Sequence, residues 1–173
     1  MRNLLILMFL SCFAFSSNLE LVQGEIKAHT EVFGDSEINP STKKIDTNLS
    51  INSIDFKSIR GKVLINSGDL KSSKEARDEN MYELLNTKVY PSVVFDIKDI
   101  KKEDKNYIIS GLLTLNGVTK ELSSQATIIK IDENIQLMGD FNILLSQFNM
   151  EAPTMFFLTV RDQIDINYTL VLK

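Results

Sequence analysis

Apolar and polar residues alternate along most of this chain, and this pattern constrains the fold more than any other feature of the sequence. Between positions 26 and 32, apolar or small residues occupy the even positions and charged or titratable residues occupy the odd ones. The stretches 45–51 and 164–172 alternate in the same way. A period of two residues is typical of strands that bury one face. We therefore predict a chain that is mostly β, with roughly eight strands.

One stretch, from Leu70 to Phe95, departs from this alternation. Leu84 and Leu85, together with apolar positions one turn earlier, recur at helical spacing. Ser72 followed by Glu75 matches a capping box, in which each side chain accepts a hydrogen bond from a free main-chain amide of the first turn. We predict a short helix here. Because the remaining chain resembles strands, we expect this helix to plug or cover the interior of the β-structure.

The strands after the helix are predicted to be joined by short turns. Asn116-Gly117 lies between two alternating stretches, and this dipeptide favours the positive φ values of a tight hairpin. Successive hairpins favour an up-and-down arrangement. Periodicity alone permits either a two-sheet sandwich or a closed barrel, with an interior that is filled or hollow. The ten Phe and six Met residues, with no Trp, could supply an adaptable apolar lining.

Residues 1–16 have the pattern of a secretory signal peptide. A positive charge near the start precedes a short apolar run, and Ala14-x-Ser16 suits cleavage before Ser17. The alternative is a lipoprotein modified at Cys12, although the bulky residues before this cysteine fit the lipidation pattern less well. Both routes export the protein, so we predict a periplasmic or secreted location, with residues 17–173 forming a single domain.

The composition argues against several functions. The formal net charge of −4 gives no indication of a nucleic-acid partner. His29 is the only histidine and falls on the polar face of its predicted strand, and Cys12, the only cysteine, lies in the leader. A zinc site or a nucleophile–histidine pair therefore lacks the necessary residues. We predict a protein that is not an enzyme and uses no metal or cofactor. A hydrolase or isomerase acting on a bound lipid is a weaker alternative.

Three motifs occur in order along the chain. They are Arg77-Asp78-x-x-Met81, then Lys88-Val89-Tyr90-Pro91-x-x-x-Phe95, then the Gly-Leu-Leu-Thr-Leu-Asn-Gly-Val-Thr-Lys run that starts at Gly111. Together they resemble the YceI-like family of periplasmic polyisoprenoid-binding proteins. The segment 143–148 lacks the arginine that relatives often carry there. The resemblance implies an all-β fold, namely a lipocalin-like extended antiparallel eight-stranded β-barrel with one short helix and an elongated apolar tunnel.

The predicted ligand site combines the inward side chains of the barrel with part of the helix. Leu113, Phe141 and Ile164 each fall on the inward side of a different strand. A basic group that includes Arg77 has two interpretations: a solvated helix face in which Arg77 pairs with a neighbouring carboxylate, or charges at the barrel mouth that meet a phosphate or quinone head group. The complete set of predicted ligand-binding residues is Phe95, Ile97, Ile109, Leu113, Leu115, Phe141, Ile143, Phe148, Ile164, Tyr168, Leu84, Leu85 and Arg77.

Two functions from different classes follow from this sequence. The first is a periplasmic binding or carrier protein that sequesters a long apolar isoprenoid, or another lipid, in a barrel tunnel. Each buried methylene contributes about 0.8 kcal/mol, so a tunnel alone gives affinity. The second is a filled β-domain that binds no lipid and acts by its surface, in envelope stress or adhesion. Either function is compatible with two further partners: a membrane surface in transient contact, and a second copy of the chain in a homodimer.

Overall fold

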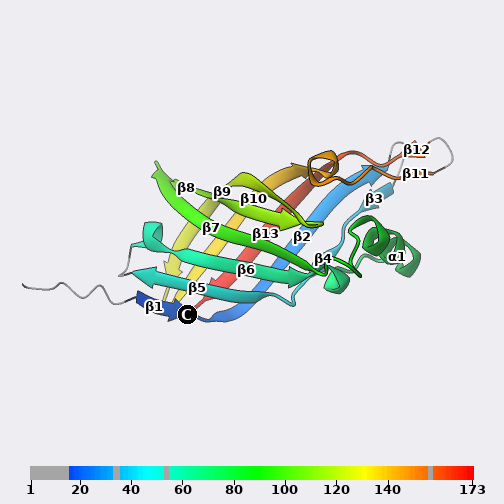
Figure 1. The fold of residues 1–173 in the computed structure, drawn as a ribbon. Helices are drawn as coiled ribbons and strands as arrows, with labels where there is room; N and C mark the ends of the chain where they lie inside the picture. The colour runs from blue at the N-terminus through cyan, green and yellow to red at the C-terminus, as the bar shows by residue number, and fades with distance from the viewer. Residues whose placement is uncertain (1–15, 33–35, 53–54, 156–157) are drawn as a thin grey trace, which may run out of the picture.

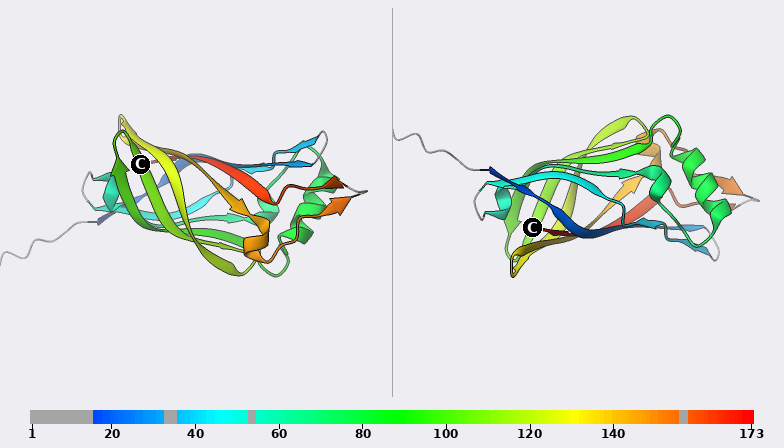
Figure 2. Two further views of the ribbon diagram at one scale, coloured as in Figure 1. Left: turned by 90° about the horizontal axis from the view of Figure 1, so that it is seen from above. Right: turned by 90° about the horizontal axis from the view of Figure 1, so that it is seen from below.

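The computed structural model describes residues 16–32, 36–52, 55–155 and 158–173. Within them, one antiparallel sheet curls around a single core, and the predicted fold class is confirmed (Figure 1). Two further views show the elongated shape of the curled sheet (Figure 2). The strands of the sheet are β1 (Ser16–Leu19), β2 (Leu21–Val32), β3 (Ser36–Ile38), β4 (Ser41–Thr42), β5 (Asp46–Asn52), β6 (Arg60–Asn66), β7 (Ser92–Glu103), β8 (Asn106–Leu115), β9 (Val118–Ile131), β10 (Asn134–Leu144) and β13 (Gln163–Leu172).

Short elements complete the described chain. β11 (Thr154–Met155) and β12 (Leu158–Thr159) form a separate pair. The α-helix α1 spans Glu75–Leu84, and three short 3-10 helices are η1 (Phe56–Ser58), η2 (Ser67–Asp69) and η3 (Leu145–Phe148). No helix in the described part of the chain is long and apolar enough to cross a membrane.

The first strand segment closes the curled sheet. β1 pairs with β5, ending at Leu19↔Leu49. β2 starts after the single residue Glu20 and pairs with β13. The main-chain groups of Glu20 and Lys173 exchange two hydrogen bonds, of 2.8 and 2.9 Å, at this bend. The sheet order β1-β5-β6-β7-β8-β9-β10-β13-β2 therefore returns to its starting segment, which makes a barrel. Its eight longer strands, β2, β5–β10 and β13, agree with the predicted number.

The alternation predicted from the sequence is visible in the burial of β8. Every second residue from Tyr107 to Leu115 is buried, and the residues between them are half-buried. At the end of β8, Asn116 and Gly117 have φ values of 49° and 72°, as the predicted tight hairpin requires. The inward residues of the strands form one hydrophobic core together with Phe148 and Met150 from the segment after β10.

The helix lies at the end of the barrel away from the C-terminus (Figure 1). The predicted capping box is wrong: Lys74 is the N-cap residue, and its side chain makes no capping hydrogen bond. Instead, the Ser72 main-chain amide donates to the carboxylate of Asp78, at 2.7 Å. Asp78 is 4% exposed, so its hydrogen bond with the Ser72 amide is shielded from water. The side chain of Glu75, by contrast, is exposed.

Replacing Asp78 with alanine is expected to lower the free energy of unfolding by about 1–3 kcal/mol, because the Ser72 amide loses its acceptor in a shielded position. Glu79→Ala is the matched control, since Glu79 is the next residue of the same helix and is exposed. Urea unfolding of both variants measures the difference. Equal losses at the two positions would show that the Asp78 contact contributes nothing specific.

Candidate functional site

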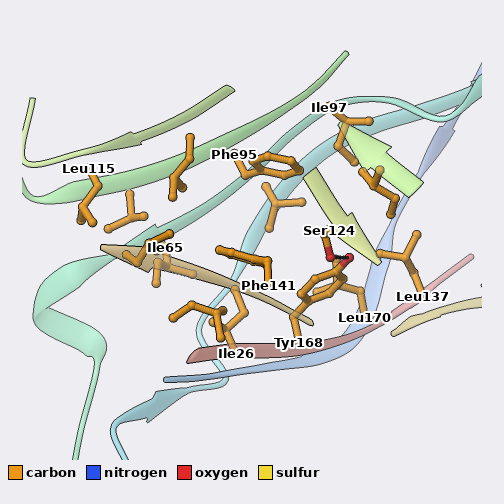
Figure 3. Close-up of a pocket in the computed structure, with 16 residues that line it drawn as sticks. Ile26, Ile65, Phe95, Ile97, Leu115, Ser124, Leu137, Phe141, Tyr168 and Leu170 are labelled. Carbon is orange, nitrogen blue, oxygen red and sulfur yellow. Dashed lines mark hydrogen bonds between the residues drawn. The ribbon is translucent and has the colours of Figure 1, made fainter. Parts of the chain in front are cut away.

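An apolar cavity lies inside the barrel. It has a volume of about 120 Å³ and sixteen lining residues, and no described lining residue is charged. Figure 3 shows these side chains converging on the cavity from strands on opposite sides of the barrel. The lining residues are Ile26, Val63, Ile65, Val93, Phe95, Ile97, Ile109, Leu113, Leu115, Ser124, Leu137, Phe141, Ile143, Ile166, Tyr168 and Leu170.

The structure brings eight of the thirteen predicted site residues together around this cavity. They come from β7, β8, β10 and β13, and they are Phe95, Ile97, Ile109, Leu113, Leu115, Phe141, Ile143 and Tyr168. Their contact with a ligand stays a prediction. The other five, Phe148, Ile164, Leu84, Leu85 and Arg77, do not line the cavity.

These five residues have structural positions that explain the difference. Phe148 belongs to η3 and is 1% exposed, within the core. Ile164 has the predicted inward parity but packs against that core without reaching the cavity. Leu84, the last residue of α1, packs against the core, and Leu85, its C-cap residue, belongs to the core. Arg77 donates from Nη1 to the main-chain carbonyl of Glu37 at 3.1 Å, and no described carboxylate forms an ion pair with it.

Eight lining residues were absent from the predicted set: Ile26, Val63, Ile65, Val93, Ser124, Leu137, Ile166 and Leu170. The alternation itself could have found most of them, since Val93 shares its strand face with Phe95, and Ile166 shares its face with Tyr168. Ser124 is different, because its side chain is polar, and only its shared strand face with Ala126 and Ile128 indicates an inward position.

β9 and β10 diverge beside the cavity. Their pairing runs from Asn134↔Ile131 to Asp140↔Gln125 and then stops. In the described chain, residues 118–124 of β9 pair only with β8. We call this divergence the fork. Ser124 lies at the fork and donates from Oγ to the main-chain carbonyl of Asp140 at 2.9 Å. A side-chain hydrogen bond thus continues the connection for one residue beyond the last main-chain pair.

The segment after β10 contacts the β8–β9 turn. Asn116, at the β8–β9 turn, donates from Nδ2 to the main-chain carbonyl of Phe148 at 3.0 Å. This contact holds η3 against the hairpin. The Asn116 Oδ1 atom is buried and has no hydrogen-bond partner within the described chain. The Phe148 side chain is almost completely enclosed in the core at this position.

Two hydroxyl groups are the polar side-chain atoms of the cavity lining. The oxygens of Ser124 and Tyr168 lie 2.9 Å apart (Figure 3). Gly139 faces Tyr168 across the β10–β13 pair, and a Cβ atom at Gly139 would collide with the Tyr168 hydroxyl. Burial raises the pKa of Tyr168 to about 12, so this hydroxyl is protonated and neutral at physiological pH.

The titratable groups singled out from the sequence lie outside this cavity. His29 Nδ1 is 2.6 Å from Asn39 Oδ1, and this hydrogen bond raises the pKa of His29. Lys71 lies over the ring of Tyr82, 5.0 Å from its centroid. Tyr82 in turn donates to the main-chain carbonyl of Leu70 at 2.7 Å. The described residues contain no group of three or more His, Cys, Asp or Glu arranged to hold a metal ion.

The fold and the site define a class: an antiparallel β-barrel with a short helix at one end and an apolar cavity between its strands. A family profile described as "YceI-like domain" matches residues 19–172, which is most of the chain. The chain therefore belongs to the YceI-like family, and the resemblance seen in the sequence is confirmed.

Individual relatives agree with this assignment. A UPF0312 protein of Pectobacterium atrosepticum is 31% identical over 99 residues, which are 56% of this chain and 43% of that protein. The chain spans less than half the length of the curated relatives that it matches first, at 43%, 41% and 48%. The crystal structure of Burkholderia cenocepacia BcnA has a TM-score of 0.76 at 16% identity, covering 86% of this chain and 95% of BcnA.

A second solved structure is that of a ligand-binding domain. It is a polyisoprenoid binding domain from Saccharophagus degradans implicated in plant cell wall breakdown. Its TM-score is 0.70 at 11% identity, and the match covers 90% of this chain and 97% of that domain. At identities this low, it is the structural likeness to both proteins that establishes the shared barrel fold.

Proposed function

We propose that this protein binds an isoprenoid or related lipid chain in its barrel cavity and carries it outside the cytoplasm, without catalysing a reaction. The observation that carries the proposal is the cavity, whose lining is apolar except for two neutral hydroxyls. The likeness to a polyisoprenoid binding domain supports the class of ligand. Burial of apolar surface supplies the affinity, and the barrel wall shields the chain from water.

The cavity volume limits how much of a chain the barrel accepts without rearranging. An engineered protein cavity of about 150 Å³ binds benzene, and the volume here is about 120 Å³. Six buried carbons contribute roughly 5 kcal/mol, which gives at best a sub-millimolar dissociation constant. Burying more of a long chain inside the barrel therefore requires lining side chains to move. Phe95 and Phe141 are only half-buried, which makes them the first candidates to move.

Export and the absence of catalysis complete the proposal. The leader predicted at residues 1–16, and the alternative lipidation at Cys12, lie outside the described residues except for Ser16, the first residue of β1. The single histidine is on the outer face, away from the cavity. A soluble barrel of this kind suits a lipid that has to cross water between two membranes.

Organic extraction of the purified protein, followed by mass spectrometry, tests the binding proposal. We expect an apolar lipid to co-purify in stoichiometric amount. The delipidated protein should then bind prenyl alcohols of increasing length with increasing affinity. An empty extract, together with no binding at any length, would leave the filled β-domain that acts by its surface as the better description.

Leu113→Phe is expected to shorten the longest chain that binds, because Leu113 is buried and lines the cavity. Losing contact with one or two methylenes weakens binding of that chain by about tenfold, while stability changes by less than about 1.5 kcal/mol. Leu112→Phe is the control, since Leu112 directly precedes Leu113 in β8 and does not line the cavity. Identical length profiles in both variants would place the chain elsewhere.

A further inference from the structure

We infer that the hydroxyl oxygen of Tyr168, whose own proton is donated to Ser124, receives a hydrogen-bond donor of the bound lipid, so that the ligand is an uncharged chain that carries a hydroxyl or an amide N–H. This inference rests on the proposed binding of a lipid chain and specifies the chemistry of that lipid. The cavity, the order of the hydrogen bonds inside it and the charges around it each point in this direction.

The neighbours of Ser124 determine where the protons of the two hydroxyls point. Ser124 Oγ lies 2.9 Å from the carbonyl oxygen of Asp140 and 3.1 Å from that of Gln125. Carbonyl oxygens only accept, so the single proton of Ser124 points towards them. The proton between Ser124 and Tyr168 therefore comes from Tyr168, and Ser124 accepts it across 2.9 Å.

This arrangement leaves the Tyr168 hydroxyl oxygen able to accept one more hydrogen bond. A tyrosine hydroxyl donates one hydrogen bond and also accepts. The donor of Tyr168 is used by Ser124, and the described chain places no donor against its oxygen. Tyr168 and Ser124 both line the cavity, so this acceptor is open to a ligand within it. A hydroxyl or an amide N–H satisfies the acceptor without disturbing either existing bond, whereas a ketone, an ether or a quinone cannot.

The uncharged lining makes the interior of the barrel unsuitable for a charged head group. A phosphate moved into an apolar cavity without a cation pays a large desolvation cost. None of the sixteen lining residues carries a charge. The negative charge of Asp140 lies close enough to contribute to the raised pKa of Tyr168, and the same charge opposes an anion there. Arg77, which one interpretation of the sequence placed at a phosphate or quinone head group, does not line the cavity and donates to the Glu37 carbonyl.

The test compares three C15 isoprenoid probes on the delipidated full chain: farnesol, its methyl ether and farnesyl phosphate. Titration calorimetry should show farnesol binding about 3- to 10-fold more tightly than the ether, which corresponds to one neutral hydrogen bond. The phosphate should bind more weakly than farnesol. In Tyr168→Phe, farnesol and the ether should bind equally, with the affinity for the ether unchanged.

Tyr107→Phe is the matched control, because Tyr107 is buried in the core but does not line the cavity. It should keep the full preference for farnesol. Ser124→Ala is a second test that does not depend on the folding of the tyrosine variant. Without Ser124 as acceptor, the Tyr168 hydroxyl is free to donate a hydrogen bond to the ligand. An ether oxygen can accept this bond, so the preference for the alcohol over the ether should narrow.

The outcomes separate this inference from the proposed function. Equal affinities for farnesol and its ether in the wild type, or a preference that persists in Tyr168→Phe, would overturn the inference and leave lipid binding intact. Tight binding of the phosphate that depends on Tyr168 would overturn it as well. Failure of all three probes, and of the graded prenyl alcohols, would instead count against the proposed function.

Discussion

Replacing Phe148 with alanine is expected to lower the free energy of unfolding by about 3–5 kcal/mol, whereas the same change at Phe141 should cost only about 1 kcal/mol. Phe148 is 1% exposed, so its removal leaves a void that close-packed neighbours cannot fill. Phe141 is half-buried and already borders the cavity of about 120 Å³, so its removal enlarges an existing space.

Urea unfolding of the delipidated proteins measures this difference. The two variants remove identical atoms, and each phenylalanine serves as the control for the other. Lipid binding should respond in the opposite order. Phe141→Ala should alter the chain-length profile, while Phe148→Ala should leave the profile intact under conditions in which the protein is folded. A loss of 3 kcal/mol or more at Phe141 would mean that the interior is a filled core, and the carrier proposal would lose its basis.

Gly61→Ala is expected to be the most damaging single methyl addition in the sheet. Gly61 is at the start of β6 with a φ of 121°, a conformation that residues with a side chain rarely adopt. It pairs with Leu49 on one side and Ile97 on the other. An added Cβ would collide with the main-chain carbonyl oxygen of Asn48. Because this neighbour is backbone in a paired strand, no change of rotamer relieves the collision.

Backbone strain of about 1–3 kcal/mol and overpacking of about 1–3 kcal/mol predict a total loss of roughly 2–6 kcal/mol for Gly61→Ala. Gly68→Ala is the control: an added Cβ there would meet its nearest atoms at 3.2 and 3.5 Å, at side chains, and Gly68 does not have a positive φ. This control should cost less than about 1 kcal/mol. Thermal unfolding of both variants, monitored by far-UV circular dichroism, provides the comparison. Similar melting temperatures would show that β6 can shift away from β5.

The sequence predicted the faces of the strands well, because the side-chain direction in a strand depends only on position. Leu113 and Tyr168 were placed inward from alternation alone. Depth along the barrel is a different quantity, since it depends on which strands lie opposite and how far they are staggered. Ile164 shows the difference: its parity is inward, but it packs beyond the cavity. Parity cannot distinguish these two positions.

Two other errors have a local cause. Phe148 is the last residue of η3, which follows β10, and in this helical turn the alternation no longer reports the direction of a side chain. The expected cap of α1 relied on the spacing between Ser72 and Glu75, whereas burial of Asp78 decided which carboxylate receives the amide. The period did not separate barrel from sandwich, since both satisfy it; tight hairpins favoured an up-and-down arrangement, and the resemblance to a family implied the barrel.

The pairing of β2 with β13 has a consequence for the order of folding. β2, the second strand of the chain, is held by β13, the last strand described, and the main-chain groups of Glu20 and Lys173 form hydrogen bonds directly. Contacts between such distant parts of a chain form slowly, because a long loop has to close before they give any return in free energy. A ribosome-bound chain that lacks β13 cannot complete the barrel, because β13 pairs with both β10 and β2, so the barrel stays open until β13 has been synthesised. Such a chain suits the proposed export, since a late-folding chain is still extended when it reaches a translocation channel.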